Sequence, residues 1–234
     1  PEGTGRPELG PLTSPVGEIF RYVLRSDTGL SPMDLRTLQD WTVVPHLLRT
    51  EGLTDITTVG GEVKEFQVIV NPDQLRKFEL DLTDLQTAIE NNNANTGGNS
   101  IFRGTQEIPV RAIGAVQDEK DIRNIIIGVR KNVPIFMKDV AQVRVGHPPF
   151  NGIFGYYNAD SGENIPHAVQ GIVLMLRGQN PNNVLKRFKH QVETLNQQLK
   201  PAGAELVPMM DRSVLTQNTL FTVSKTMLEG ITVV

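Results

Sequence analysis

Two acidic residues, Glu18 and Asp55, stand at the starts of two segments that are predicted to be strands. Glu18 stands at the start of the segment GEIFRYVLRS, which is rich in aromatic and β-branched residues, and Asp55 opens the strand after the first predicted helix. The two strands of a strand–helix–strand unit run parallel and begin at the same end of a sheet. If they are neighbours, both carboxylates lie at one edge, where they could bind a divalent cation. The alternative is two solvated acids at strand ends.

The other residue types that bind metals or react form no pattern. Cysteine is absent, which excludes disulfides, thiolate zinc sites and cysteine nucleophiles. Met209 and Met210 are adjacent in a predicted strand and point to opposite faces, so core packing of one of them is favoured over a shared soft-metal site. The four histidines have no metal-ligand spacing: His46, His147, His167 and His190.

Properties of the whole sequence narrow the classes of function. It has no G-x-S-x-G, phosphate-binding loop or H-E-x-x-H motif, so we predict that the chain is not an enzyme and binds no cofactor. A net charge of −3 and a pI near 5.9 give no basic field for a nucleic-acid partner. The N-terminal stretch lacks the apolar segment of a signal peptide, and no apolar run of about twenty residues could cross a bilayer.

The two acidic residues belong to a predicted strand–helix–strand unit. A strand over 17–26 is followed by a helix with Ser31 as N-cap and Pro32 at the first helical position. Pro45 should kink this helix, because proline removes one backbone hydrogen bond. Two more strands are predicted on either side of Gly60 and Gly61, a pair typical of a hairpin turn.

A second unit with the same order of elements occupies residues 168–211. A strongly apolar strand leads to Asn180 as N-cap and Pro181 at the first helical position. The helix carries an apolar stripe at steps of three and four residues, formed by Val184, Phe188, Val192, Leu195 and Leu199. Two such units in one sheet predict an α+β fold, the split βαβ or ferredoxin-like sandwich, with both helices on one face.

About a hundred residues lie between the two units and are predicted to form an inserted α+β segment. Helical patterns cover 71–93 and 118–128, and strands are predicted over 108–116 and 133–146. The polar, glycine-rich stretch NANTGGNSIFRGTQE is predicted to be a protruding loop, and HPPFNG to be a turn.

Several stretches of the sequence carry a resemblance to a known family. They resemble, in the same order, the periplasmic porter region of resistance-nodulation-division (RND) efflux pumps, and most closely the heavy-metal branch of the CzcA/CusA type. The likeness covers essentially all 234 residues. The stretches are PELGPLTSPVGEIFRYVL, DLRTLQDWTVVPHLLRTEGLTDITTVGG, QVIVNPDQLRKFELDLTDLQTAIENNN, VPIFMKDVAQVRVG, GIVLMLRGQN and DRSVLTQNTLFTVSKTMLEGI.

The resemblance implies that the chain lies between transmembrane helices 1 and 2, as the periplasmic portion of an inner-membrane protein. Residues 1–16 would then be the end of the first porter subdomain and a linker. Residues 17–63 and 166–212 would form the two halves of the second porter subdomain. Residues 64–165 would be an inserted subdomain that docks an outer channel. Residues 213–234 would be the helix that leads into the second transmembrane helix.

The resemblance also implies partners and sites. The full pump would be a proton-driven homotrimer that works with a periplasmic adaptor and an outer-membrane channel, transports a metal cation and is anchored by transmembrane helices outside this sequence. An arm reaching the neighbouring protomer would contain Asn95, Gly97, Gly98, Asn99, Arg103 and Gln106. A channel-docking turn would contain His147, Pro148, Pro149, Phe150 and Asn151.

Two other functions are compatible with these patterns. One is a porter fragment of a multidrug RND pump, but the stretches LGPLTSPVGEIFRY and TLQDWTVVPHLLR favour the metal branch. The other is a soluble ferredoxin-like regulatory module that binds a small ligand. The apolar C-terminal segment and the docking-like insertion argue against this module.

Overall fold

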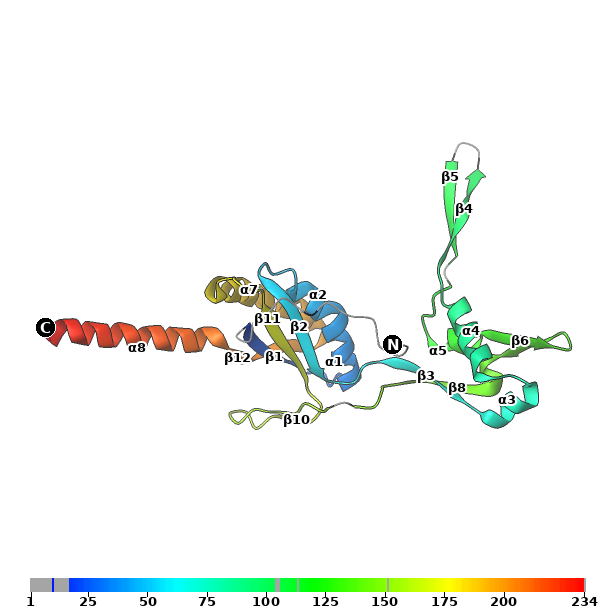
Figure 1. Ribbon diagram of the computed structural model, residues 1–234, viewed down its shortest axis with the longest axis horizontal. Helices are drawn as coiled ribbons and strands as arrows, with labels where there is room; N and C mark the ends of the chain where they lie inside the picture. The colour runs from blue at the N-terminus through cyan, green and yellow to red at the C-terminus, as the bar shows by residue number, and fades with distance from the viewer. Residues whose placement is uncertain (1–9, 11–16, 104–105, 113, 151, 234) are drawn as a thin grey trace, which may run out of the picture. The chain divides into compact units, whose positions relative to one another are not determined.

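The computed structural model of the chain divides into two compact units (Figure 1). Unit 1 contains Pro1–Val63 and Pro149–Val234, and unit 2 contains Lys64–Pro148. Residues 149–165, which the sequence assigned to the inserted segment, therefore belong to unit 1. The residues that the structure describes are 10, 17–103, 106–112, 114–150 and 152–233.

Unit 1 is built on a four-stranded antiparallel sheet with the strand order β12-β1-β11-β2. This order interleaves the two strand–helix–strand units, as in a split βαβ fold. As a result β1 and β2 are parallel to each other but not adjacent, since β11 lies between them. The strands are β1 (Glu18–Ser26), β2 (Leu53–Gly60), β11 (Val169–Met175) and β12 (Ala204–Asp211).

The helices that connect the strands of this sheet share one hydrophobic core with a single face of it. Phe20 of β1 packs edge-to-face on Phe188 of α7, with ring centroids 5.1 Å apart. Ser31 and Asn180 cap α1 and α7 through their side-chain oxygens, as the sequence predicted. The apolar stripe of α7 is buried, which confirms its predicted orientation. The helices are α1 (Pro32–Leu38), the π-helical η1 (Gln39–Val43), α2 (Val44–Leu47), α7 (Pro181–Leu199) and the short 3-10 helix η2 (Lys200–Ala202).

Near Pro45, where a kink was predicted, the helix contains the π-helical turn η1, which ends at Val43. Proline lacks a backbone N–H and its ring crowds the carbonyl four residues earlier, and a wider turn accommodates both. Gln39 begins this turn and is fully buried. Its Nε2 donates to the Tyr22 hydroxyl at 2.9 Å and to Thr58 Oγ1 at 3.3 Å.

The predicted hairpin around Gly60 and Gly61 is wrong. Both glycines have positive φ, 79° and 69°, so the chain does turn there. However, β2 pairs with β11 in unit 1, whereas the next strand, β3, pairs with β8 in unit 2. The turn packs on α1 instead, where Arg36 Nη1 donates to the Gly60 carbonyl at 2.8 Å. The glycine pair therefore marks the passage from one unit to the other.

Two further elements of unit 1 follow less regular paths. A short hairpin, β9 (Tyr156–Tyr157) and β10 (Asn164–Ile165), precedes β11. The long helix α8 (Arg212–Val233) begins directly where β12 ends, which confirms the helix predicted for the C-terminal segment. In the described part of the chain, no helix combines the length and apolar character needed to cross a membrane.

Unit 2 has its own hydrophobic core, which includes Leu75, Leu85, Ile122 and Met137. Asn71 and Asp81 cap its first two helices through their side-chain oxygens. The apolar IIIG stretch, read as helical in the sequence, forms a strand instead. The elements are β3 (Glu65–Val70), α3 (Pro72–Phe78), α4 (Leu82–Asn92), β4 (Thr96–Arg103), β5 (Gln106–Ala112), α5 (Glu119–Arg123), β6 (Ile126–Arg130), β7 (Val133–Phe136), α6 (Met137–Val140) and β8 (Ala141–Gly146).

Candidate functional site

The sheet of unit 1 has a second face, opposite the helices, which we call the open face. Side chains alternate along a strand, so the two faces can be assigned from the register. In β11, Val169 and Val173 point into the core, whereas Gln170, Ile172 and Leu174 belong to the open face. The open face therefore combines apolar residues with the polar and charged residues of the neighbouring strands.

The two predicted metal ligands lie on this open face, in one row. Glu18 pairs across the ladder with Leu174, and Leu174 pairs on its other side with Asp55. The shared-site hypothesis supposed that the strands of Glu18 and Asp55 are neighbours. They are not, because β11 lies between them. Two strand spacings separate their backbones by about 10 Å, so one ion would have to lie above Leu174 to reach both carboxylates.

The two carboxylates have different surroundings. Glu18 forms a two-point ion pair with Arg21, in which Arg21 Nη2 donates to Glu18 Oε2 at 2.9 Å. Hydrogen bonding to Glu18 raises the pKa of Arg21 above its ordinary value. Among the described residues, Asp55 has no hydrogen-bond or ion-pair partner, and no three or more acidic or histidine side chains are grouped around one ion position. Of the two carboxylates, only that of Glu18 is therefore paired with a cation among the described residues.

A thioether and an amide meet over the middle of the open face. Gln170 Nε2 lies 3.7 Å from Met209 Sδ, and these two residues belong to the strands on either side of β1. Their contact therefore passes over Val23, which is fully buried although it faces away from the helices. Neither Met209 nor Met210 is part of the buried core, so the predicted core packing of one of them is wrong.

At the other end of β1, Arg25 draws three carboxylates together. Its guanidinium nitrogens lie 3.3 Å from Asp27, 3.6 Å from Glu163 and 3.1 Å from Glu205. Glu163 belongs to the turn of the β9–β10 hairpin, so Arg25 ties this hairpin to the sheet. No sequence pattern predicts this cluster, because Glu163 and Glu205 are far from Arg25 along the chain.

The residues of the predicted arm form a two-stranded ribbon rather than a loop. Gly97, Gly98, Asn99 and Arg103 lie in β4, Gln106 begins β5, and the two strands are antiparallel. The ribbon stands out from unit 2 in Figure 1. Asn95 precedes it, and its Oδ1 accepts hydrogen bonds from the backbone of Gly114 at 3.1 Å and Ala115 at 3.2 Å. Asn95 therefore closes the base of the ribbon.

The residues of the predicted docking turn do not join two strands of unit 2. Glu65 pairs with Gly146, so His147 follows the end of the ladder at which the chain enters the unit. Gln67 Nε2 donates to the His147 carbonyl at 3.0 Å, and Pro148 is the last residue of unit 2. Pro149 and Phe150 already belong to unit 1, and Asn151 lies outside the described residues. This segment is the return connection between the units.

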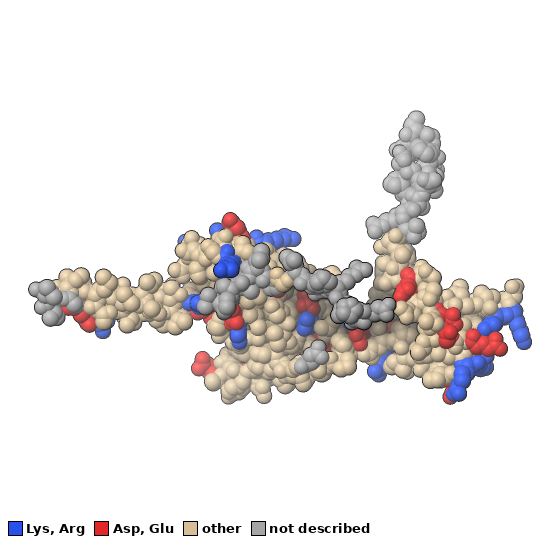
Figure 2. Space-filling model, in the orientation of Figure 1, with Lys and Arg blue, Asp and Glu red and all other residues tan. Residues whose placement is uncertain are grey.

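The face drawn in Figure 2 shows no large field of one charge among the described residues. On the face drawn in Figure 2, lysine and arginine side chains are interspersed with aspartate and glutamate. This mixed pattern is typical of a solvated surface and not of a nucleic-acid interface.

Comparison with known proteins decides the family. The model for the AcrB/AcrD/AcrF family matches residues 1–234. The chain belongs to this family. It is 35% identical over 242 residues to the cobalt-zinc-cadmium resistance protein CzcA of Cupriavidus metallidurans, covering 100% of this chain and 22% of CzcA. It is 34% identical over 229 residues to the cation efflux system protein CusA of Escherichia coli K12, covering 97% and 21%.

Solved structures of this AcrB/AcrD/AcrF family show the same fold. A crystal structure of a heavy metal efflux pump matches 94% of this chain with a TM-score of 0.82 at 37% identity, and the chain covers 21% of that protein. The chain therefore spans about a fifth of the length of the relatives it matches. These relatives are named for the efflux of metal cations or for resistance to them. They therefore belong with the heavy-metal branch of RND pumps that the sequence resembles.

Proposed function

We propose that this chain is the periplasmic porter and docking part of a heavy-metal RND pump, placed between its first two transmembrane helices. The observation that carries the proposal is the match along the whole chain to proteins named for metal efflux and resistance, together with the fold of the heavy metal efflux pump. Unit 1 would be the porter subdomain, and unit 2 the inserted subdomain that docks partners. The complete pump would be a proton-driven trimer in the inner membrane that works with an adaptor and an outer channel.

The exposed side chains of α8 support the proposal that this helix lies against lipid or other helices in the complete pump. Leu215, Phe221 and Ile231 are between 67% and 71% exposed, so the described chain leaves most of each side chain uncovered. Its threonine hydroxyls turn back onto the helix itself, as when Thr226 Oγ1 donates to the Thr222 carbonyl at 2.7 Å. A hydroxyl satisfied in this way needs no water, which suits a helix that runs toward lipid or other helices.

The proposed function can be tested in cells that lack their own metal exporters. Cells that make the full-length protein should hold less cobalt, zinc, cadmium or copper than cells with an empty vector, as measured by mass spectrometry. A variant in which a short linker replaces residues 64–148 should lose this effect, because it would lack the docking unit. If the full-length protein left every metal unchanged but lowered the accumulation of a dye such as ethidium, it would be a multidrug pump instead.

The open face is the part of unit 1 that we propose lines the metal path. Asp55→Asn should weaken metal resistance at least several-fold, because it removes the carboxylate without a described partner. Glu18→Gln should have a smaller effect, since Arg21 already neutralises Glu18. Glu193→Gln, an exposed acid on α7, is the matched control and should leave resistance unchanged. Equal resistance in the Asp55 and Glu193 variants would remove Asp55 from the path.

A further inference from the structure

In the part of the chain that the structure describes, the contacts given between the long helix α8 and the rest of unit 1 lie at its beginning. It contains 22 residues, which corresponds to about 33 Å at a rise of about 1.5 Å per residue. Arg212, Ser213 and Thr216 are partly covered, whereas the side chains described from Gln217 to Glu229 are all exposed. The direction of the whole helix therefore depends on the contacts of its first turn.

The first of these contacts joins α8 to α7. Lys189 forms an ion pair with Asp211, and Lys189 Nζ also donates to Ser213 Oγ at 2.7 Å. Asp211 Oδ1 in turn accepts from the backbone N–H of Ser213 at 2.9 Å and from its hydroxyl at 2.7 Å. The same carboxylate thus satisfies an N–H of the first turn of α8 and binds a cation from α7.

The second contact joins α8 to β1. Arg212 Nη1 donates to the backbone carbonyl of Glu18 at 3.3 Å, and the Glu18 carboxylate is held by Arg21. One contact would leave the helix free to swing about it. Two contacts, on two different elements, restrict both the tilt and the rotation of α8.

Electrostatics make the contact with α7 depend on both partners. The N-terminus of a helix carries a partial positive charge, so it attracts a carboxylate and repels a lysine. Lys189 lies beside the first turn of α8 because Asp211 lies between the two charges. Without the carboxylate, Lys189 would face the positive end of the helix directly and would move away from it.

We propose that Lys189 and Asp211 are positioning residues that hold α8 in one direction relative to the sheet of unit 1. Because β12 continues into α8 without a loop, a tilt of the helix would be passed to the edge of the open face. This transmission of tilt from α8 to the sheet rests on the proposed function, in which α8 leads toward the membrane. A small change where β12 passes into α8 has a large effect: a tilt of about 10° at the start of α8 would move the far end of a helix of this length by about 6 Å.

The direction of α8 can be measured as a distance between two spin labels. The chain contains no cysteine, so labels can be placed at Gln197→Cys on α7 and Met227→Cys on α8 in the full-length protein after removal of any cysteines elsewhere. The unmodified pair should give one narrow distance distribution. Lys189→Met and Asp211→Asn should each broaden it by about 4 Å, because Met227 lies about 22 Å along α8 from its start and a swing of about 10° moves it by about that amount.

Two further variants make the result specific. Lys186→Met removes an exposed lysine one turn earlier on α7 and should keep the distribution narrow. Exchanging the two charges, Lys189→Asp with Asp211→Lys, puts a lysine at the capping position, so the distance distribution should be broad. Lys189→Arg keeps the positive charge beside Asp211, so its distance distribution should be narrow. Melting temperature and helical content are recorded for each variant, because a general loss of structure would change these as well. If Asp211→Asn does not fold, Lys189→Met and Lys189→Arg still decide.

The outcomes separate this inference from the proposed function. A narrow distribution in a folded Lys189→Met protein would overturn the positioning role, whatever the protein transports. A broad distribution together with unchanged metal efflux would support the role in direction and overturn the transmission of tilt to the sheet. A broad distribution with reduced efflux would support both steps.

Discussion

The amide of Gln39 is a polar group that the core of unit 1 depends on. Gln39 and Tyr22 are fully buried, and burial raises the pKa of Tyr22 well above its usual range, so its hydroxyl stays neutral. Gln39→Leu should destabilise unit 1 by about 1–3 kcal/mol, because the buried Tyr22 hydroxyl would lose its partner. Unfolding in urea measures the change, with the exposed Gln198→Leu as control.

A double variant tests the reason for this loss. Adding Tyr22→Phe to Gln39→Leu removes the unsatisfied hydroxyl, so the pair should lose less stability than the sum of the two single variants. Losses that simply add would mean that the two side chains act independently and that the hydrogen bond of 2.9 Å contributes little.

Asp211 should make part of the stability depend on pH. Burial raises the pKa of Asp211, but hydrogen bonds from Lys189 and Ser213 outweigh this effect and hold the pKa below its ordinary value. A pKa that is lower in the folded state stabilises the fold above the unfolded value, near pH 4, and this stability is lost as the pH falls through the folded value. Asp211→Asn should therefore lower the melting temperature at pH 7 but have much less effect at pH 3. An equal loss at both values would show that the charge of Asp211 is not what stabilises the joint.

Helices were predictable where local signals define them, and strand pairing was not. The capping residues Ser31 and Asn180 and the stripe of α7 act over a few residues, so the sequence alone placed these helices. The partners of β2 and β3 lie far along the chain, and a glycine pair cannot show whether a turn joins two paired strands or leads to another unit. For the same reason the row of Glu18, Leu174 and Asp55 could not be foreseen, because it depends on the position of β11 between the other two strands.

The β9–β10 hairpin should be held to the sheet mainly by its ion pair. Arg25 lies 3.6 Å from Glu163, and partly exposed ion pairs contribute about 0.2–1 kcal/mol. Glu163→Gln should therefore speed hydrogen exchange of the amides over 156–165 by up to about fivefold, the factor that corresponds to about 1 kcal/mol, while β1 exchanges as before. Asp160→Asn in the same turn is the control. Identical exchange in the two variants would show that other contacts hold the hairpin.

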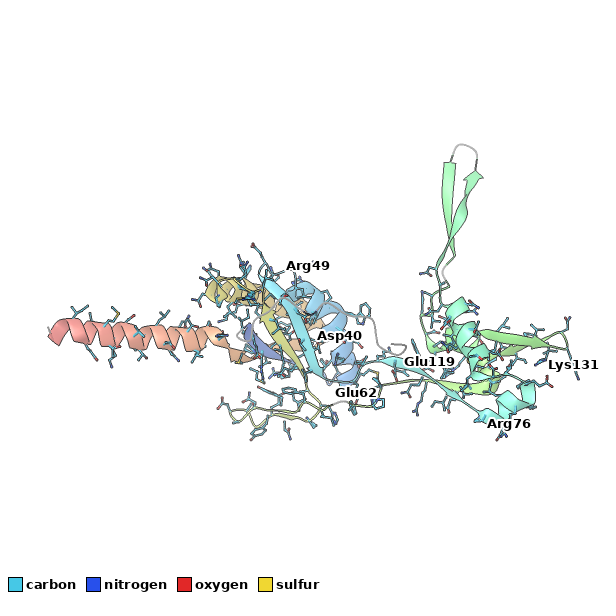
Figure 3. All side chains as sticks on the ribbon, viewed as in Figure 1. Asp40, Arg49, Glu62, Arg76, Glu119 and Lys131 are labelled. Carbon is cyan, nitrogen blue, oxygen red and sulfur yellow. The ribbon has the colours of Figure 1, made fainter. Side chains whose placement is uncertain are left out.

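The two units divide the proposed work of the molecule. Unit 1 contains the open face with Glu18 and Asp55, and the helix α8. Unit 2 contains the β4–β5 ribbon and a second hairpin, β6–β7. That hairpin joins β6 to β7 through Lys131 and Asn132, both with positive φ, as in the tight turns that favour paired strands. Figure 3 shows Lys131 at the tip of this hairpin. Val129 and Val133 beside the turn are each 62% exposed, so they offer apolar surface that a partner could cover.

Docking of a partner protein should therefore depend on the β6–β7 hairpin more than on the segment 147–151 that the sequence indicated. We expect the double variant Val129→Ser and Val133→Ser to reduce both metal resistance and co-purification of partner proteins with the full-length pump, while its oligomeric state remains the same. The fold of unit 2 should tolerate this change, because both side chains already face solvent. Phe150→Ser, in the return connection, should leave co-purification unchanged. The reverse result would be lost co-purification for Phe150→Ser and unchanged co-purification for the valine pair. It would place the docking surface at 147–151, as the resemblance to RND pumps implied.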